Sequence, residues 1–298
     1  MAAGAVTTNF VEIPTQRLDA WLGKVKGGSV VAALSPAMPQ KFGAGKALTF
    51  DIGEAEYVGA GQNKGATEVT KESQTVEPFK FHKTIRFDEE VQWADEDHQM
   101  EILDEILAQI QPSLSRALDF GVVHGINPTG GTAVAAMTQK LSAVTNVVTR
   151  GAGKPYIELD AADALVTAGG FVPSDVALDP TFASAFSSAR GTQGEQKLYP
   201  DFRLSTEVSN LDGHRASVSR TAAATGVAAA APKMLGIVGD FSAIRWGVQK
   251  QIGLELIKYG DPDGLGDLKR KNQVAFRAEV VYGWGIADLD AFALIKSA

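Results

Sequence analysis

The alternation of apolar and polar residues predicts a long β-hairpin near the amino-terminal end. Apolar residues recur at every second position from Leu48 to Ile52. A second run begins near Val69 and places Phe79, Phe81, Ile85 and Phe87 on one face. A period of two is typical of half-buried strands. The segment between them, Gly53 to Lys71, is rich in Gly, Glu and Lys. We therefore expect two paired strands with a polar tip. They need a surface to lie on, because an isolated hairpin is marginally stable in water.

After the hairpin, apolar residues recur every three or four positions, which predicts a long helix. Acidic residues crowd its start, at 95–101, where the helix dipole favours negative charge. Pro112 lies inside the pattern and should kink the helix, because it removes one backbone hydrogen bond. We expect one bent helix that ends near His124, before the glycine-bearing segment 125–131. Its apolar residues recur at spacings of three and four and share one face: Met100, Leu103, Leu107, Ile110, Leu114 and Leu118.

The second half of the chain predicts short, mixed elements, so the fold class is α+β. A charged, glycine-bearing loop is expected at Tyr259–Lys271, and the pattern assigns no structure to Ala216–Ala231. Helices are expected at Ile157–Ala168 and Phe182–Arg190. Strands are expected at Val176–Leu178, Leu235–Val238, Ile252–Leu256, Val274–Tyr282 and Phe292–Ile295.

Residues 1–45 show no sustained period. Gly and Pro recur there, and the apolar residues are scattered. Such a segment buries little of itself. We expect an arm that is either disordered or laid against another surface.

Composition narrows the class of protein without identifying it. The 298 residues are 45% hydrophobic and 21% charged, as in ordinary globular chains. With 35 acidic and 28 basic residues the net charge is -7, so a broad nucleic-acid-binding surface is not expected. The absence of cysteine excludes disulfides, thiolate zinc sites and cysteine nucleophiles. Neither a signal peptide nor a stretch long enough to span a membrane is expected.

Residue types used in catalysis are present without the spacing that catalytic sites need. The four histidines are widely separated. Asp95–His98 could be a metal cluster, but a charged helix start accounts for it better. The glycine-rich strings 59–65 and 151–154 fit flexible loops better than nucleotide-binding loops; after the second, Pro155 replaces the Ser or Thr that would hold magnesium. We therefore predict no catalytic, cofactor-binding or metal-binding residues, and no cofactor.

Several strings, taken in order, resemble the major capsid proteins of tailed phages. The predicted long helix ends in Leu118–Gly125, and the turn Asn127–Gly130 follows it. The strand in Val176–Pro180 runs into an Asp-Pro pair. The strongest likeness is Leu235–Ser242, which contains Gly-Asp-Phe, together with the strands that follow it. No single motif is diagnostic, and the resemblance rests on the co-linear set, which covers essentially the whole chain.

The resemblance implies a Hong Kong 97-type capsid fold and a structural function. Many copies would form the hexamers and pentamers of an icosahedral shell around double-stranded phage DNA. The implied segments are an N-terminal arm at 1–45, an extended β-hairpin loop with flanking strands at 46–87, a peripheral domain with the long spine helix at 88–150, an axial domain at 151–238, peripheral strands and a loop at 239–287, and a final axial strand at 288–298.

The resemblance also implies partners and a location. Besides other copies of the chain, a separate scaffolding protein, a portal and a decoration protein are candidates. A fused scaffolding segment is not expected, because the arm and the hairpin occupy the residues before the helix. Packaged DNA would be enclosed without sequence-specific binding, and no membrane is involved. The protein would be assembled in the host cytoplasm and belong to the capsid of the virion.

Charged residues in two predicted loops are the candidates for contacts between subunits. The resemblance implies that the later loop lies at threefold positions of a shell, and its opposite charges would make those contacts sensitive to salt. Some members of the family join subunits through a Lys–Asn isopeptide bond, but the strings around the hairpin lysines and Asn272 do not match that pattern, so no crosslink is expected. The candidates are Lys64 and Lys71 in the hairpin and Asp261, Asp263, Asp267, Lys269, Arg270 and Lys271 in the later loop.

Two other functions remain open from the sequence. An encapsulin-type compartment would keep the fold but enclose a cargo enzyme. An enzyme with an unrecognised acid/base site would hold carboxylates close together in a pocket, with shifted pKa values.

Overall fold

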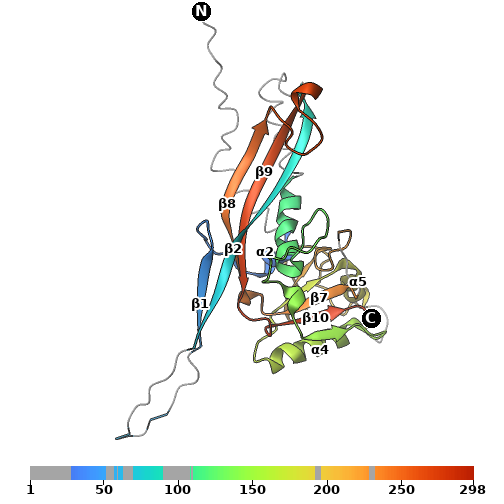
Figure 1. Ribbon diagram of the computed structural model, residues 1–298. Helices are drawn as coiled ribbons and strands as arrows, with labels where there is room; N and C mark the ends of the chain where they lie inside the picture. Colours follow the sequence, from blue (N-terminus) through green and yellow to red (C-terminus); the bar gives the residue numbers. More distant parts are fainter. Residues whose placement is uncertain are drawn as a thin grey trace, which may run out of the picture.

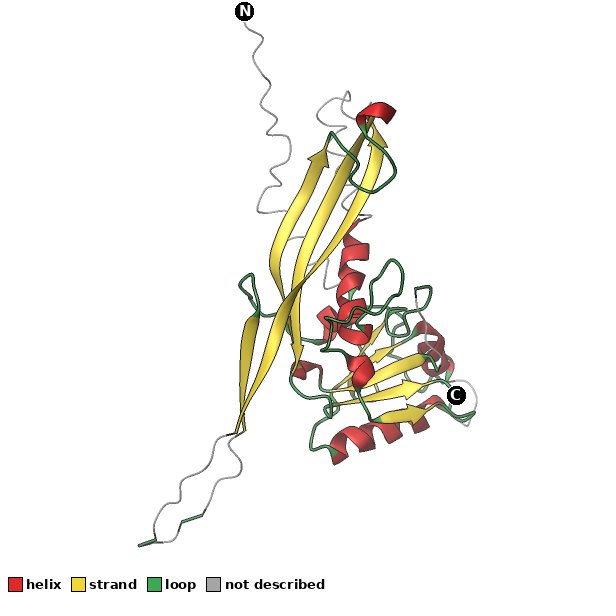
Figure 2. Ribbon diagram, in the orientation of Figure 1, coloured by secondary structure: helices red, strands yellow, loops and turns green. Residues whose placement is uncertain are grey.

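The chain forms a long, narrow sheet and a compact mixed domain beside it (Figures 1 and 2). The computed structural model describes residues 28–51, 57–58, 60–62, 70–89, 108, 110–191, 196–227 and 232–298. Most of the predicted arm, the tip of the hairpin and the first part of the predicted long helix lie outside these ranges. Both a helical and a strand-rich component are present, so the predicted α+β class is confirmed.

The long sheet contains the predicted hairpin and extends it. All its neighbouring strands are antiparallel, and the order is β1-β2-β9-β8. The first strand pairs only with the start of the second, from Thr70 to Val76. From Glu77 to Asp88 the second strand pairs instead with the third strand of the sheet. The strands are β1 (Gly45–Asp51), β2 (Thr70–Asp88), β8 (Ile244–Ile257) and β9 (Gln273–Ile286).

A segment before β1 crosses this sheet from one edge to the other. Met38 donates its backbone N–H to Trp246 O, 2.8 Å away, at the outer edge of β8. The chain then reaches β1 at the opposite edge. Two glycines leave room for the crossing: a Cβ at Gly247 would lie 2.1 Å from the Met38 carbonyl oxygen, and one at Gly283 would lie 2.3 Å from Oε1 of Gln40.

The spine helix packs against the long sheet. It is helical through residues 110–119, continues as the π-helix η2 (Phe120–His124), and ends at Gly125, whose φ of 66° is left-handed. The predicted end near His124 is confirmed. Gly121 is required for packing, because a Cβ there would lie 2.5 Å from the ring of Trp284.

The compact domain is built on a six-stranded sheet of order β3-β10-β7-β4-β6-β5. The predicted helices and the strands β4, β7 and β10 are confirmed to within about two residues. β3 and the β5–β6 hairpin were not predicted. The elements are β3 (Val147–Thr149), α4 (Pro155–Ala168), β4 (Asp175–Leu178), α5 (Pro180–Ser188), β5 (Ser209–Leu211), β6 (His214–Val218), β7 (Met234–Gly239) and β10 (Phe292–Lys296).

Alternate residues of this second sheet face two different cores. Val176 and Leu178 of β4 pack with α4 and α5, whereas Ala177 between them packs with the spine helix. All four residues of β4 are buried. A central strand that is apolar on both faces is expected when a sheet is covered on both sides.

Part of the predicted arm belongs to the folded body. The short helix α2 (Val30–Leu34) begins at the cap residue Ser29 and is almost wholly buried in the core beside the spine helix. The expectation of a segment laid against another surface therefore holds for residues 29–38, and that surface is the chain's own core and the edge of β8.

The Gly-Asp-Phe string has a packing explanation. A Cβ at Gly239 would lie 2.2 Å from Ala291 O, so only glycine allows the chain to pass so close before β10. Asp240 caps the short 3-10 helix η4 (Phe241–Ala243) by accepting the N–H of Ser242 at 2.8 Å. Phe241 is fully buried and meets Phe292 edge to face, with ring centroids 5.6 Å apart.

Candidate assembly contacts

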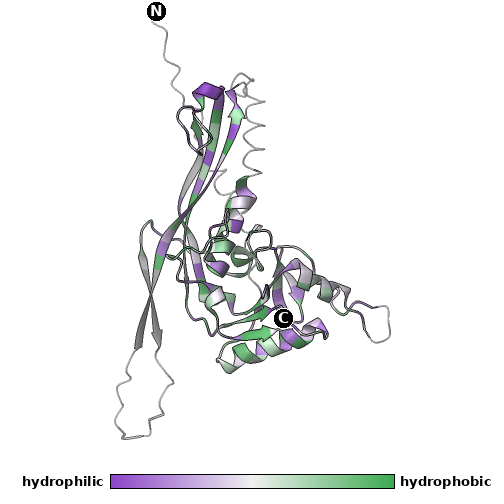
Figure 3. Ribbon diagram, turned by 45° about the vertical axis from the view of Figure 1, so that its right-hand side comes forward, coloured by the Kyte–Doolittle hydropathy of each residue, from purple (hydrophilic) through white to green (hydrophobic). Residues whose placement is uncertain are grey.

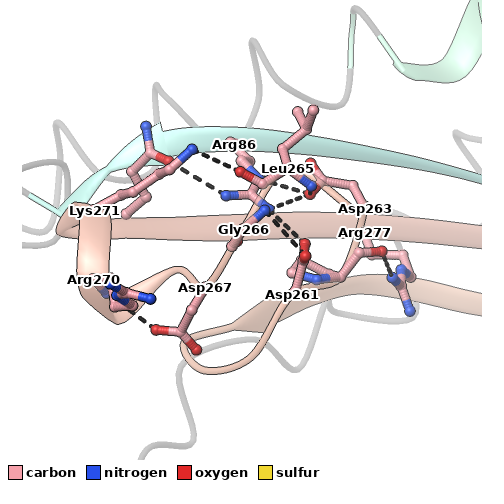
Figure 4. Close-up of polar contacts among 11 residues, drawn as sticks. Arg86, Asp261, Asp263, Leu265, Gly266, Asp267, Arg270, Lys271 and Arg277 are labelled. Atoms are coloured by element: carbon pink, nitrogen blue, oxygen red, sulfur yellow. Dashed lines mark hydrogen bonds and ion pairs between the residues drawn. The ribbon is translucent and has the colours of Figure 1, made fainter.

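The charged loop between β8 and β9 is organised around one arginine (Figure 4). Arg86, on β2, directs its guanidinium into the loop and binds Asp263 with Nε, at 2.7 and 2.8 Å from the two carboxylate oxygens. Its Nη2 donates to Asp261 at 3.0 Å and to Gly266 O at 2.8 Å. A planar guanidinium suits such forked contacts better than an ammonium group. The contact lowers the pKa of Asp263 and raises the pKa of Arg86.

Most of the predicted contact residues in this loop therefore have partners within the chain. Lys269 donates to Glu89 at 2.6 Å, which raises the pKa of the lysine. Lys271 donates to Leu265 O at 2.6 Å, and Asp267 accepts the backbone N–H of Arg270 at 3.0 Å.

The Arg270 side chain stands apart from the other loop charges. It is exposed in the 3-10 helix η5 (Lys269–Lys271), and no side-chain contact is found for it among the described residues. Two large exposed apolar side chains lie in the same loop: Tyr259 is 70% exposed and Leu265 is 64% exposed. Figure 3 shows this end of the long sheet as strongly hydrophilic around η5.

The hairpin candidates are only partly described. Lys64 lies outside the described residues. Lys71 is in β2, where its backbone pairs with Phe50 of β1.

A buried carboxylate on the spine helix was not predicted as a functional residue. Asp119 is fully buried and accepts hydrogen bonds from Ser29 Oγ and Thr221 Oγ1, both at 2.5 Å. The backbone N–H groups of Val30 and Val31 donate to its two oxygens, both at 3.1 Å. Burial raises the pKa of Asp119, and these hydrogen bonds oppose that shift. The sequence signal was only an aspartate among apolar helix positions; its donors come from distant segments.

A buried histidine ties the β5–β6 hairpin to α4. Nε2 of His214 lies 3.0 Å from Oδ1 of Asp163, and Nδ1 lies 3.2 Å from Leu211 O. Both ring nitrogens thus face acceptors, and only the imidazolium can donate to both. The hydrogen bond to Asp163 is the main reason that the pKa of His214 is raised.

An open cleft of about 790 Å³ lies between α2 and the edge of the second sheet. Two of its carboxylates have structural partners: Asp175 lies 2.8 Å from the guanidinium of Arg215, and Asp240 caps η4. Glu207 also lines the cleft. In the described part of the chain, no group of acidic or histidine side chains is placed to hold a metal ion. None of the described helices is both long and apolar enough to cross a membrane.

Comparison with known proteins places this architecture in one family. The model of the phage capsid family matches residues 13–297. A solved chain from Mycobacterium phage Ogopogo is 41% identical, with a TM-score of 0.76 over 91% of this chain and 92% of that one. A chain from Gordonia phage Cozz is 29% identical, with a TM-score of 0.71 over 91% and 86%.

More distant structures show the same fold. The capsid of a native GTA particle, computed with C5 symmetry, is 15% identical, with a TM-score of 0.57 over 92% of this chain and 90% of that one. No curated protein sequence matches the chain. The Hong Kong 97-type capsid fold expected from the sequence is confirmed, and the encapsulin alternative is not favoured. Because the family model matches nearly the whole chain and the fold agrees, the chain belongs to the phage capsid family and is a major capsid protein.

Proposed function

We propose that copies of this chain assemble as hexamers and pentamers into an icosahedral shell that encloses double-stranded phage DNA. The observation that carries the proposal is the β1–β2 hairpin, which projects beyond the body (Figure 1). In the described chain β1 pairs only with β2, so its outer edge is open. Exposed strand edges tend to pair with, or be covered by, another chain. A neighbouring subunit provides that cover.

The domain roles follow the predicted segments. The axial domain, residues 151–238 with the final strand, meets its copies at the centre of a capsomer. The peripheral part, with the spine helix and the long sheet, builds the edges. The part of the predicted arm (1–45) that precedes Gly28 lies outside the described residues. It reaches along a neighbour, and the hairpin overlaps the next subunit. We retain these roles as proposals.

The loop 261–271 contacts other subunits through a smaller set of residues than the sequence suggested. Asp261, Asp263 and Lys269 have partners within the chain. Arg270 is the charged group best placed to bind a neighbour, with Tyr259 and Leu265 as apolar contacts. Rim charges of this kind give salt-dependent association.

The shell is proposed to work without catalysis. A separate scaffolding protein, a portal and a decoration protein are its further partners. A net charge of -7 suits a container for DNA that does not bind its contents through a broad surface. Assembly takes place in the host cytoplasm, and the product is the capsid of the virion.

Light scattering and negative-stain imaging of the purified full-length chain test the proposal. We expect closed shells under some condition of salt, pH or added scaffolding protein. A chain that stays monomeric under all of them contradicts the proposal. Mass spectrometry and nuclease treatment of particles from infected cells then identify the contents: DNA supports the phage shell, and a bound enzyme supports a compartment.

A charge reversal tests the loop contact. Arg270→Glu should raise the subunit concentration needed for shell formation, because it reverses the charge offered to a neighbour. The fold should not change, since the side chain has no intrachain contact among the described residues to lose. Arg203→Glu is compared with it: Arg203 is also exposed but lies in the compact domain, where it has a 3.9 Å ion pair with Glu207 to lose. Assembly of Arg270→Glu equal to that of the unsubstituted chain would remove Arg270 from the interface.

A further inference from the structure

The hydrogen bonds of Asp119 join three segments that are far apart in the sequence. Asp119 ends the regular part of the spine helix, Thr221 lies in the turn after β6, and Ser29 caps α2. The next two residues of α2 also donate their N–H groups to this carboxylate. One side chain therefore satisfies much of the first turn of α2, whose amides have no partners within the helix.

The residue before the cap of α2 lies against the same helix. A Cβ at Gly28 would lie 2.7 Å from Cβ of Ser115 on the spine helix. Ser29 is fully buried. The path of the chain just before α2 is thus fixed by close packing at Ser115 and by hydrogen bonds at Asp119, one turn apart on the same helix.

α2 has little stability of its own. It is five residues long, and a helix of that length does not form in isolation. An ionised carboxylate offers acceptors to all four donors. An asparagine in its place offers one oxygen, and its NH₂ group faces other donors, so buried N–H or O–H groups lose their partners.

We propose that Asp119 is the positioning residue for the amino-terminal arm: by fixing α2, it sets the point from which residues 1–27 reach a neighbouring subunit. This inference rests on the proposed function as a shell subunit with an arm. Asp119 acts through α2 and touches no neighbour itself. Its loss therefore weakens assembly while most of the fold persists.

The experiment compares Asp119→Asn with a matched control in the full-length chain. Asp179→Asn is the control, because Asp179 is also a buried helix-capping carboxylate, but it holds α5 in the compact domain. Thr221→Val removes one donor to Asp119 with little change in shape, and Thr221→Ser keeps the hydroxyl. This pair gives a readout if Asp119→Asn does not fold. Each variant is also made in a chain that lacks residues 1–27.

Two quantities are measured. Hydrogen exchange of the α2 amides of Ala33 and Ser35, which bond within the helix, reports whether α2 is held. The lowest subunit concentration that yields shells reports assembly. This threshold can also be measured for the truncated chain, even if that chain assembles only at a higher concentration. We expect Asp119→Asn and Thr221→Val to speed α2 exchange and raise that concentration, each by about ten-fold or more. Asp179→Asn and Thr221→Ser should change both far less.

The truncated chain separates positioning from a general structural role. If Asp119 acts through the arm, its substitution adds nothing to the assembly defect of the truncated chain, a non-additivity that a merely structural role does not produce. An equal added defect in the truncated chain, or unchanged α2 exchange, overturns the inference. Failure of the unsubstituted chain to form shells contradicts the proposed function instead.

Discussion

The two sheets of this protein bury their residues in different ways. In the six-stranded sheet, β4 is wholly buried and β10 nearly so, because helices cover both faces. In the long sheet, the described side chains of β2 from Val76 to Asp88 are mostly exposed or half-buried. The central strands of the compact sheet are thus covered within one chain. In the long sheet β9 is also largely buried, but β2 offers surface that one chain does not cover.

The difference separates folding from assembly. A sheet covered on both faces gains its stability from the chain itself. A narrow sheet with an open edge gains cover when copies come together, and large shared interfaces follow. Changes in the compact sheet should therefore unfold the subunit, and changes at the ends of the long sheet should act mainly on the shell.

Removing the hairpin tip should have the largest effect on assembly without weakening the fold. Replacing residues 52–69 by Asn-Gly leaves Asp51 paired with Thr70 across a two-residue turn, which is the loop that antiparallel strands prefer. We expect the unfolding free energy of the subunit to fall in no case and to rise by about 2 kcal/mol at most, since shortening an 18-residue loop to two residues lowers the entropy cost of closing it by roughly that amount. Shells should not form, as judged by negative-stain images.

A control separates the effect of the tip's length from the effect of its sequence. The same images are taken of a chain whose residues 60–62 are replaced by Ser-Gly-Ser, which keeps the loop length. Normal shells from the shortened chain would show that the hairpin does not overlap a neighbour.

Equal substitutions in the core of the compact domain, at a residue of α5 that packs on its sheet, and in β2 of the long sheet should cost unequal amounts of stability. Phe186→Ala in the compact core removes a fully buried ring that meets Phe182, Tyr199 and Phe202, so we expect a loss of about 3–5 kcal/mol. Phe87→Ala removes a half-buried ring near the end of β2, with an expected loss of about 1–2 kcal/mol. Urea unfolding of the unassembled subunits measures both. Equal losses would contradict the contrast between the sheets.

The same contrast explains how much the sequence could predict. β4 and β10 were found as short apolar runs, and the Asp179-Pro180 pair marked the start of α5. In β8 only the second half was predicted, although the strand starts at Ile244. Bulges after Val248 and Ile252 shift the pairing register and break the alternation on which the prediction depends.

Two misses differ in kind. The β5–β6 hairpin had a local signal: Asp212-Gly213 is a favoured hairpin turn, and both residues have positive φ, 53° and 91°. Asp119 had only a weak one, an aspartate among apolar helix positions, and nothing local pointed to its partners, because its donors lie about 90 and 100 residues away in the chain. Local patterns predict elements, but only the folded chain reveals which distant groups share a buried carboxylate.

Two histidines should respond to pH in opposite directions. The folded pKa of His214 is raised, so its stabilising contribution is complete below the unfolded value of about 6.5 and is lost as pH rises through the folded value. The folded pKa of His124 is lowered, mainly by burial, so its contribution is present above about 6.5 and lost as pH falls through the folded value. Neutral His124 places Nε2 2.8 Å from Thr221 O.

Urea unfolding between pH 5 and 9 tests the pair. His214→Gln should remove the fall in stability on the alkaline side, and His124→Gln should remove the fall on the acid side. Amide exchange should place the alkaline loosening in the β5–β6 hairpin, next to α4. If His214→Gln leaves the alkaline limb unchanged, the imidazolium does not hold the hairpin to α4.

The smallest expected effect concerns the loop at the far end of the long sheet. Arg86→Lys keeps the positive charge but cannot bind Asp261 and Asp263 together, because an ammonium group lacks the guanidinium fork. Amide exchange at Leu265 and Gly266 should rise by roughly two- to five-fold, and high salt should raise it similarly in the unsubstituted chain. Arg277→Lys is the control, since the hydrogen bond of Arg277 to the same loop goes to a backbone carbonyl.

The subunit's unfolding free energy should not change. If exchange also stays unchanged, the turn bonds from Leu265 and Gly266 N–H to the two aspartates hold the loop without Arg86. The charges would then be available to a neighbouring subunit, as the sequence first suggested.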